Sequence, residues 1–238
     1  HRRAAGLGDY PDHPAFRGQH APGGVLALYS PLFGSIPADA PAGTVSTGQV
    51  LQTGGGALDP ALEDFLRAGP PPVVFTLGSA SAHAARGFFE ASLGIARRLG
   101  VRALLLTGTA PPALPTGEAR RIMARASAPY HLVFPHARAV VHQGGIGTIA
   151  LAIAAGVPML LVPFAHDQPD NAARARRAGL ARVLPRWRYT LDGARVLHHV
   201  LEDKAMRDRL ATARRRIVSE AGAEHAAAEI LRAAQGAR

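Results

Sequence analysis

The sequence of 238 residues contains no cysteine, which excludes disulfide bonds, thiolate metal sites and a cysteine nucleophile. It also lacks an apolar run of about 18 residues, the length that a membrane-spanning helix needs, and its N-terminus has no signal-peptide pattern. We therefore expect a cytoplasmic, globular protein. Aromatic residues make up only 5% of the chain, so aliphatic side chains must supply most of the core.

Lysine is nearly absent, since Lys204 is the only one, yet the formal net charge is +10. Such a charge can indicate a nucleic-acid partner. Here the arginines are scattered over many predicted helices, without a compact basic arm, an RNP-type aromatic motif or a zinc knuckle. We attribute the abundance of Arg, Ala, Gly and Pro to a GC-rich coding sequence and expect no nucleic-acid partner.

A glycine-rich segment, His142-Gln-Gly-Gly-Ile-Gly-Thr148, lies between two apolar runs. The β-branched run before it and the alanine-rich stretch after it predict a strand that leads directly into a helix. Gly144, Gly145 and Gly147 let a ligand approach the backbone and allow positive φ. The unpaired N–H groups at the helix start and the Thr148 hydroxyl favour an anion. We therefore predict that a phosphate or diphosphate binds here.

A second polar loop follows the next predicted strand. The segment Gly156-Val-Pro-Met-Leu-Leu-Val-Pro163 predicts a helix end and a buried parallel strand, and Phe164-Ala-His-Asp-Gln-Pro-Asp-Asn171 comes next. In an open α/β sheet both loops lie at the edge where ligands bind. Asp167 and Gln168 are therefore candidates for contacts to a polyhydroxylated group, with Asn171 adding a polar contact. Asp167 is equally a candidate helix cap.

Predicted strands and helices alternate through most of residues 70–202, which indicates a Rossmann-like, doubly wound α/β sheet. The segment 70–79 predicts a strand that ends in a Gly78-Ser79 turn, and 80–99 predicts an amphipathic helix. Residues 101–107 and 181–184 favour strands, whereas 121–126 fit a strand or a helix. Three further helices are expected over 190–201, 203–219 and 224–234.

The first 60 residues do not continue this alternation. Residues 25–31 predict a short strand for which we find no neighbouring strand, and residues 31–60 are punctuated by proline and glycine as loops are.

The combined motif, from Ser127-Ala-Pro-Tyr-His-Leu-Val-Phe-Pro135 through His142–Thr148 to Asp167–Asn171, resembles the donor-binding signature of family 1 glycosyltransferases with the GT-B fold. It is most similar to the bacterial enzymes that glycosylate lipids, sterols and antibiotic-like aglycones. The resemblance covers about 45 residues in register, which makes it more specific than a lone glycine loop. It implies that Asp167 and Gln168 contact the donor sugar, and Asn171, on the first turn of the helix that follows, is a further candidate for a polar contact there. The residues that it implies for the donor diphosphate are Gly78, Ser79, His142, Gly144, Gly145, Gly147 and Thr148.

The connector over residues 129–135 corresponds to the segment that lies against the nucleobase in this family. Many plant members have a stacking tryptophan where this sequence has Ser127, with Tyr130 nearby. This departure leaves the base, uridine or thymidine, open. Tyr130 and Val133 are candidates for nucleobase contacts, and packing is the alternative role for both. For Ser79 the alternative role is a helix N-cap.

The resemblance implies inverting hexosyl transfer from a UDP- or dTDP-sugar to a small-molecule or lipid hydroxyl, without metal or cofactor. The family's general base is a histidine near the start of the full enzyme, and no histidine here lies in the matching context. We therefore assign no catalytic residue and expect this chain to be inactive alone. Residues 1–60 are expected to be a remnant of the N-terminal acceptor domain and linker, and 61–220 the donor domain. Residues 221–238 are expected to be a helix that returns to the missing N-terminal domain.

Two alternatives remain open from the sequence. Gly145, Gly147 and Ala150 satisfy the G-x-G-x-x-A form, with Asp167 about 20 residues later, as in an NAD(P)-binding oxidoreductase. Asp167 does not close the second strand, however, as that fingerprint requires. The other alternative is an inactive fragment that binds nucleotide sugar. The full enzyme is also a candidate for peripheral association with a membrane.

Overall fold

The computed structural model describes residues 3–6, 8, 20, 23–78, 85–108 and 117–236. The chain forms two compact units. One comprises His1–Pro31, Ser35–Val50 and Ala221–Arg238, and the other comprises Leu32–Gly34 and Leu51–Glu220. In the described parts of the chain, every helix is too short or too polar to traverse a lipid bilayer.

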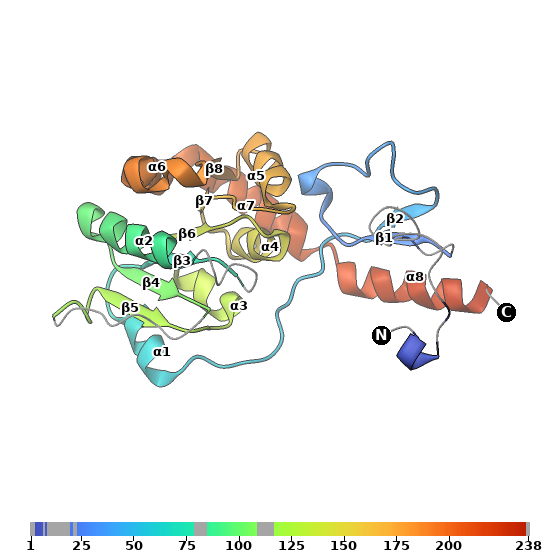
Figure 1. Ribbon diagram of the computed structural model, residues 1–238, viewed down its shortest axis with the longest axis horizontal. Helices are drawn as coiled ribbons and strands as arrows, with labels where there is room; N and C mark the ends of the chain where they lie inside the picture. Colours follow the sequence, from blue (N-terminus) through green and yellow to red (C-terminus); the bar gives the residue numbers. More distant parts are fainter. Residues whose placement is uncertain are drawn as a thin grey trace. The chain divides into compact units, whose positions relative to one another are not determined.

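The larger unit is built on a parallel sheet of six strands in the order β5-β4-β3-β6-β7-β8 (Figure 1). The strands are β3 (Val73–Thr76), β4 (Ala103–Leu106), β5 (Ile122–Arg125), β6 (Ala139–His142), β7 (Met159–Leu161) and β8 (Ala181–Val183). Every residue of β3, β4, β6 and β7 is buried, which explains their continuous apolar runs. The predicted doubly wound α/β fold is confirmed.

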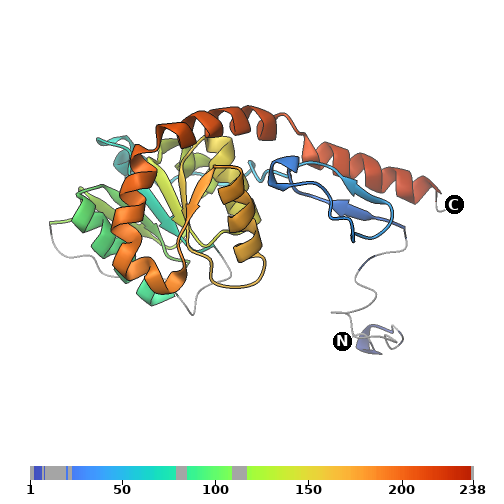
Figure 2. The same cartoon turned by 90° about the horizontal axis from the view of Figure 1, so that it is seen from above.

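Helices cover both faces of this sheet. They are α1 (Pro60–Arg67), α2 (Ala85–Leu99), α3 (Tyr130–Val133), α4 (Ile146–Ala155), α5 (Gln168–Arg177), α6 (Tyr189–Glu202) and α7 (Lys204–Val218), with 3₁₀ turns η4 (Phe134–His136) and η5 (Arg186–Arg188). The pair α2 and α6 packs on one face, and α4, α5 and α7 lie on the other (Figure 2). The helices change face because the sheet grows from β3 toward β5 and then, on the other side of β3, from β6 toward β8. Parallel strands are joined almost always by right-handed crossovers, so a reversal of direction moves the helices to the other face.

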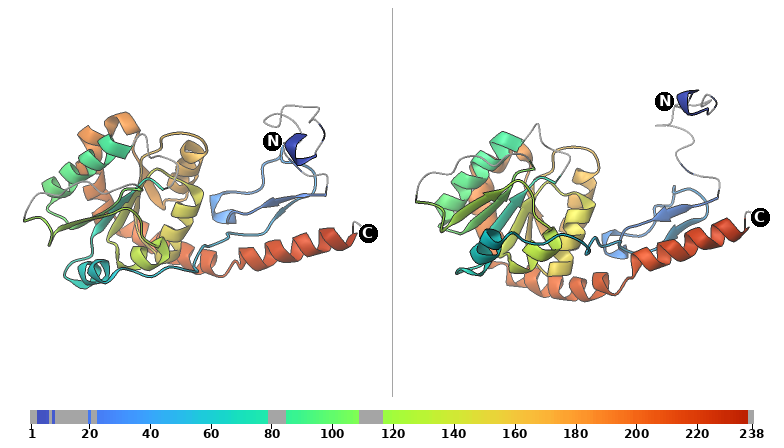
Figure 3. Two further views of the ribbon diagram at one scale, coloured as in Figure 1. Left: turned by 60° about the horizontal axis from the view of Figure 1, so that its bottom comes forward. Right: turned by 90° about the horizontal axis from the view of Figure 1, so that it is seen from below.

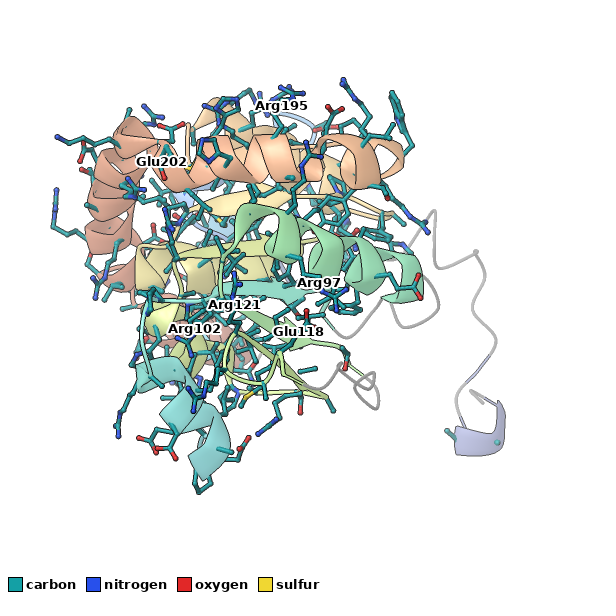
Figure 4. All side chains as sticks on the ribbon, turned by 90° about the vertical axis from the view of Figure 1, so that its left-hand side faces the viewer. Arg97, Arg102, Glu118, Arg121, Arg195 and Glu202 are labelled. Atoms are coloured by element: carbon teal, nitrogen blue, oxygen red, sulfur yellow. The ribbon has the colours of Figure 1, made fainter. Side chains whose placement is uncertain are left out.

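Local sequence explains where several of these helices begin and end. Asp59 caps α1 by accepting the Leu62 N–H at 2.9 Å, and proline occupies the first turn. Gly156 ends α4 in the left-handed conformation, with φ of 73°. In the last turn of α2, Arg97 forms a two-pronged ion pair with Glu118, with both N···O distances 2.7 Å (Figure 4). The pair connects the end of α2 to the segment before β5.

The smaller unit contains two short strands and one long helix. Its elements are η1 (Arg3–Ala5), β1 (Val25–Ala27), β2 (Thr44–Ser46) and α8 (Gly222–Gly236), and the turn η2 (Pro31–Phe33) leads out of it. β1 and β2 pair in parallel, so the expectation that the first strand has no neighbour is wrong. Figure 3 shows α8 beside these strands, and His225 Nδ1 lies 3.3 Å from the Thr47 carbonyl oxygen.

Candidate functional site: a crevice at the switch point of the sheet

The strands β3 and β6 are neighbours, and the helices that follow them leave toward opposite faces of the sheet. This is the topological switch point of a doubly wound sheet, where the loops after adjacent strands separate and open a crevice. The loop after β3 contains Gly78, and the loop after β6 contains the glycine-rich segment. The structure therefore brings the two predicted phosphate-side segments together. Ser79, predicted for the same role, lies outside the described residues.

The N-terminus of α4 faces this crevice without a side-chain cap. The first helical hydrogen bond runs from the Ile149 N–H to the Gly145 carbonyl at 3.0 Å, so the three preceding N–H groups have no partner within the helix. Gly144 has φ of 95°, and a Cβ there would come within 3.2 Å of the Gln168 carbonyl oxygen. Thr148 is buried, whereas Gly147 is exposed. The arrangement can hold an anion on backbone N–H groups.

His142 ends β6 and is fully buried. Its Nδ1 accepts the Gly144 N–H at 3.2 Å, which places the ring proton on Nε2. Among the described residues, Nε2 has no hydrogen-bond partner. Burial lowers the pKa of His142 to about 3, so the ring is neutral near pH 7. His142 can therefore offer a phosphate a neutral N–H donor rather than a positive charge.

The three predicted sugar-side residues lie at the start of α5, just beyond β7, and each has a different environment. Gln168 is buried, and its Oε1 accepts the N–H groups of Phe164 at 2.9 Å and Ala165 at 3.1 Å. Asn171 donates to Asp167 Oδ2 at 2.7 Å and to the Gly144 carbonyl at 3.1 Å. Asp167 itself is exposed. Asn171 thus connects Asp167 to the glycine-rich loop. Of the three side chains, the Asp167 carboxylate is the most accessible to a ligand.

A cavity of about 520 Å³ opens beside the glycine-rich loop, at the carboxyl ends of β3, β4 and β5. Tyr130 lines it, stacks on Phe134 at 4.8 Å between ring centroids, and shares a 2.6 Å hydrogen bond with Thr76 Oγ1. Val133, by contrast, is fully buried and packs in the core. The cavity lining comprises Gln52, Gly54, Gly55, Thr76, Gly78, Leu106, Gly108, Ala126, Ser127, Ala128, Pro129, Tyr130, His131 and Leu151.

Sequence reasoning missed three parts of this site. Thr76 lies inside a buried strand and looked like a core residue, although its hydroxyl bonds Tyr130. The segment containing Gln52 and Gly55 appeared to be linker, yet it forms one wall of the cavity. Gln143 lies between His142 and Gly144, which are both predicted to bind the diphosphate, but has no predicted role itself. Only Gln143 carried a signal, because a glutamine that follows a buried strand is an unusual polar residue for such a position.

No cluster of three or more metal-ligating side chains occurs within residues 3–6, 8, 20, 23–78, 85–108 and 117–236. The polar groups gathered at the crevice are instead N–H donors, amides and one carboxylate. Their chemistry suits hydrogen bonding to phosphates and hydroxyl groups.

Comparisons with known proteins identify the family of the chain. Residues 114–234 match the family "Erythromycin biosynthesis protein CIII-like, C-terminal domain". The chain is 42% identical over 170 residues to O-mycaminosyltylonolide 6-deoxyallosyltransferase of Streptomyces fradiae, which covers 70% of this chain and 39% of that protein.

Two solved structures share the fold. The kitacinnamycin glycosyltransferase has a TM-score of 0.68 and 25% identity, covering 87% of this chain and 54% of the other. The glycosyltransferase VinC in complex with dTDP has a TM-score of 0.67 and 23% identity, covering 88% and 52%. The chain thus spans about two fifths to one half of the relatives compared. It belongs to the erythromycin biosynthesis protein CIII-like C-terminal domain family and corresponds to the C-terminal half of family 1 glycosyltransferases with the GT-B fold.

Proposed function

We propose that this chain is the donor-binding part of an inverting glycosyltransferase that takes a sugar from a nucleoside diphosphate. One observation carries the proposal. A cavity of nucleoside size and the uncapped N-terminus of α4 lie side by side at the switch point, and Gly78 belongs to both the cavity wall and the phosphate-side loop.

In this proposal the donor lies across the crevice in three parts. The nucleobase and ribose occupy the cavity beside Tyr130. The diphosphate meets the N–H groups at the start of α4 and the Nε2–H of His142. The sugar extends toward Asp167 and Gln168. Because Gln168 Oε1 already accepts the N–H groups of Phe164 and Ala165, Gln168 contacts the sugar through its NH₂ group.

The chemistry assigned to these residues is stabilisation of the leaving group. An acceptor hydroxyl, deprotonated by a base outside residues 51–220, attacks the anomeric carbon from the face opposite the nucleoside diphosphate. Negative charge then develops on the bridging phosphate oxygen. Fixed N–H donors that are already oriented stabilise this charge without reorganisation, and one such donor is typically worth about 3–4 kcal/mol. The proposal needs no metal ion for this step.

Thymidine is the first base to test, because the VinC structure contains dTDP and shares this fold. Uridine is the alternative. Membership of a glycosyltransferase family argues against an NAD(P)-dependent oxidoreductase. An inactive nucleotide-sugar-binding fragment differs from the proposal only in whether transfer occurs.

The test is calorimetric titration of the purified chain with dTDP, UDP and NAD, repeated on His142→Ala. We expect saturable binding of dTDP or UDP and no binding of NAD. Loss of one neutral hydrogen bond should weaken the affinity of His142→Ala about 3- to 10-fold. Thermal unfolding of the variant controls for loss of structure. Tight NAD binding with no response to dTDP or UDP would overturn the proposal.

A further inference from the structure

Gln143 occupies the space between the two phosphate-side backbone segments. Its side chain is only 5% exposed. A Cβ built on Gly78 would lie 2.7 Å from Gln143 Nε2, and one built on Gly145 would lie 3.3 Å from the same atom. The amide therefore lies between the end of β3 and the N-terminus of α4, in the middle of the switch point.

The oxygen of this amide, Oε1, is buried and lacks a hydrogen-bond partner in the part of the chain that the structure describes. An unpaired buried polar atom lowers the stability of the fold, and such atoms often mark a site that a ligand completes. A leucine or methionine would fill the same space without that cost. The unpaired oxygen thus needs a hydrogen-bond donor that the described residues do not supply.

The neighbours of Gln143 indicate which ligand lies beside its NH₂ group, whereas the unpaired Oε1 needs a separate hydrogen-bond donor. Gly78 lines the nucleoside cavity, and Gly145 is the N-cap of α4. The group that would bridge these two places is the diphosphate, whose oxygens accept hydrogen bonds. Of the two halves of an amide, only the NH₂ group can donate to them.

We propose that Gln143 is a further donor-binding residue whose side-chain NH₂ donates to the diphosphate, while its Oε1 accepts from a donor hydroxyl or a bound water. This inference rests on the proposed function and assigns a residue that the family motif leaves unassigned. Gln143 thereby distinguishes a diphosphate from the nucleoside alone.

Two substitutions test the proposal through the affinities for dTDP and for thymidine, measured on the same preparations. Gln143→Met keeps the volume and removes both polar atoms, so dTDP affinity should fall about fivefold. Gln143→Glu replaces the NH₂ with a negative oxygen beside the phosphates, so dTDP affinity should fall at least about thirtyfold. Thymidine affinity should stay within about twofold of wild type for both, because it has no phosphate to contact.

Gln235→Glu, on the exposed surface of α8, is the matched control for added charge and should leave both affinities unchanged. The side-chain NH₂ signals of Gln143 in wild-type protein provide a measurement that does not depend on a variant folding. We expect dTDP to shift these NMR signals and thymidine not to shift them.

Three results would overturn the inference. They are wild-type dTDP affinity in Gln143→Met, equal loss of dTDP and thymidine binding, or NH₂ signals that do not respond to dTDP. Each of these leaves the proposed function intact if wild-type protein binds dTDP or UDP. Failure of wild-type protein to bind either nucleotide would overturn both.

Discussion

At the scale of single residues, the hydroxyl of Tyr130 links the cavity wall to the start of the phosphate-side loop. It bonds Thr76 Oγ1 at 2.6 Å, and the same Oγ1 accepts the Gly78 N–H at 3.4 Å. Burial raises the pKa of Tyr130, so this hydroxyl stays protonated at neutral pH. Through this chain of bonds, Tyr130 is a positioning residue for the backbone at Gly78.

We predict that Tyr130→Phe keeps the stack on Phe134 and removes the link to Thr76. The variant should lose about 1 kcal/mol of unfolding free energy and bind dTDP about 3- to 10-fold more weakly. Denaturant unfolding and calorimetric titration measure the two effects. Tyr29→Phe is the matched control, because that hydroxyl makes only an exposed 3.4 Å bond to the Ser35 carbonyl. Equal behaviour of the two variants would argue against the link.

The sequence indicated which residues belong to this site more readily than their tautomers and hydrogen-bond partners. The position of His142 before three glycines pointed to phosphate binding, but its tautomer depends on the Gly144 N–H, whose direction only the folded backbone sets. Gln168 was predicted from its motif, yet half of its amide holds its own loop. Such details depend on backbone directions in three dimensions, which no spacing along the sequence encodes. The ligand roles of these residues stay predictions.

At the scale of elements, the packing of α2 against α6 depends on one glycine. A Cβ on Gly193 of α6 would lie 2.4 Å from Ile95 Cδ1 and 3.2 Å from the Tyr189 ring. The ring of Tyr189 stacks on Phe88 at 5.0 Å, and its hydroxyl bonds Ser92 Oγ at 2.8 Å. Gly193 thus allows two helices to meet over this aromatic contact.

We predict that Gly193→Ala destabilises the protein by about 1–3 kcal/mol, because the added methyl overpacks a filled contact. Gly94→Ala is the matched control on α2, where a Cβ would meet nothing within 4 Å. That change should stabilise by up to about 1 kcal/mol through helix propensity. Denaturant unfolding of both variants decides the matter, and equal stabilisation by the two substitutions would show that the α2–α6 contact is loose.

Long periodic helices and short, continuously apolar strands were predictable, whereas the pairing of short strands without such a pattern was not. The helices over 190–201 and 203–219 correspond to α6 and α7, because an apolar stripe repeats over several turns. Residues 121–126 fitted either structure, and β5 forms there because it pairs with β4. Likewise β1 has only three residues, and its partner β2 lies in a stretch rich in proline and glycine. Tertiary pairing decides such segments, and local pattern does not show it.

At the scale of the whole molecule, charge repulsion and one buried ring both lower stability as pH falls. The chain carries a formal net charge of +10 at pH 7 with its histidines counted as neutral, and proton uptake in acid adds to this charge. The resulting repulsion acts mainly through solvent, so salt screens it within about 8–10 Å at ordinary ionic strength. His142 differs, because its ring is buried and must stay neutral in the fold. Its effect on stability should therefore persist in high salt.

We predict an acid loss of stability that His142 causes. Its pKa is about 3 in the fold and 6.5 in the unfolded chain, so below pH 6.5 the unfolded chain takes up a proton that the fold excludes. Stability is then complete above pH 6.5 and falls as pH drops toward 3. Between pH 6.5 and 5 the loss should reach about 2 kcal/mol, since one pKa unit is worth about 1.4 kcal/mol.

Denaturant unfolding from pH 7.5 to 5 in 0.5 M KCl measures this loss, with His142→Asn as the comparison because asparagine can still accept the Gly144 N–H. The pH range avoids the carboxylates. Hydrogen bonds from Arg125 and Arg97 lower the pKa values of Asp59 and Glu118, respectively. The stability that these two carboxylates contribute is lost only as pH falls below their ordinary pKa values of 3.8 and 4.5. The variant should show a much flatter profile than wild type. Parallel profiles would mean that His142 has the same pKa in the folded and unfolded chain, and the conclusion that burial keeps its ring neutral would then be wrong.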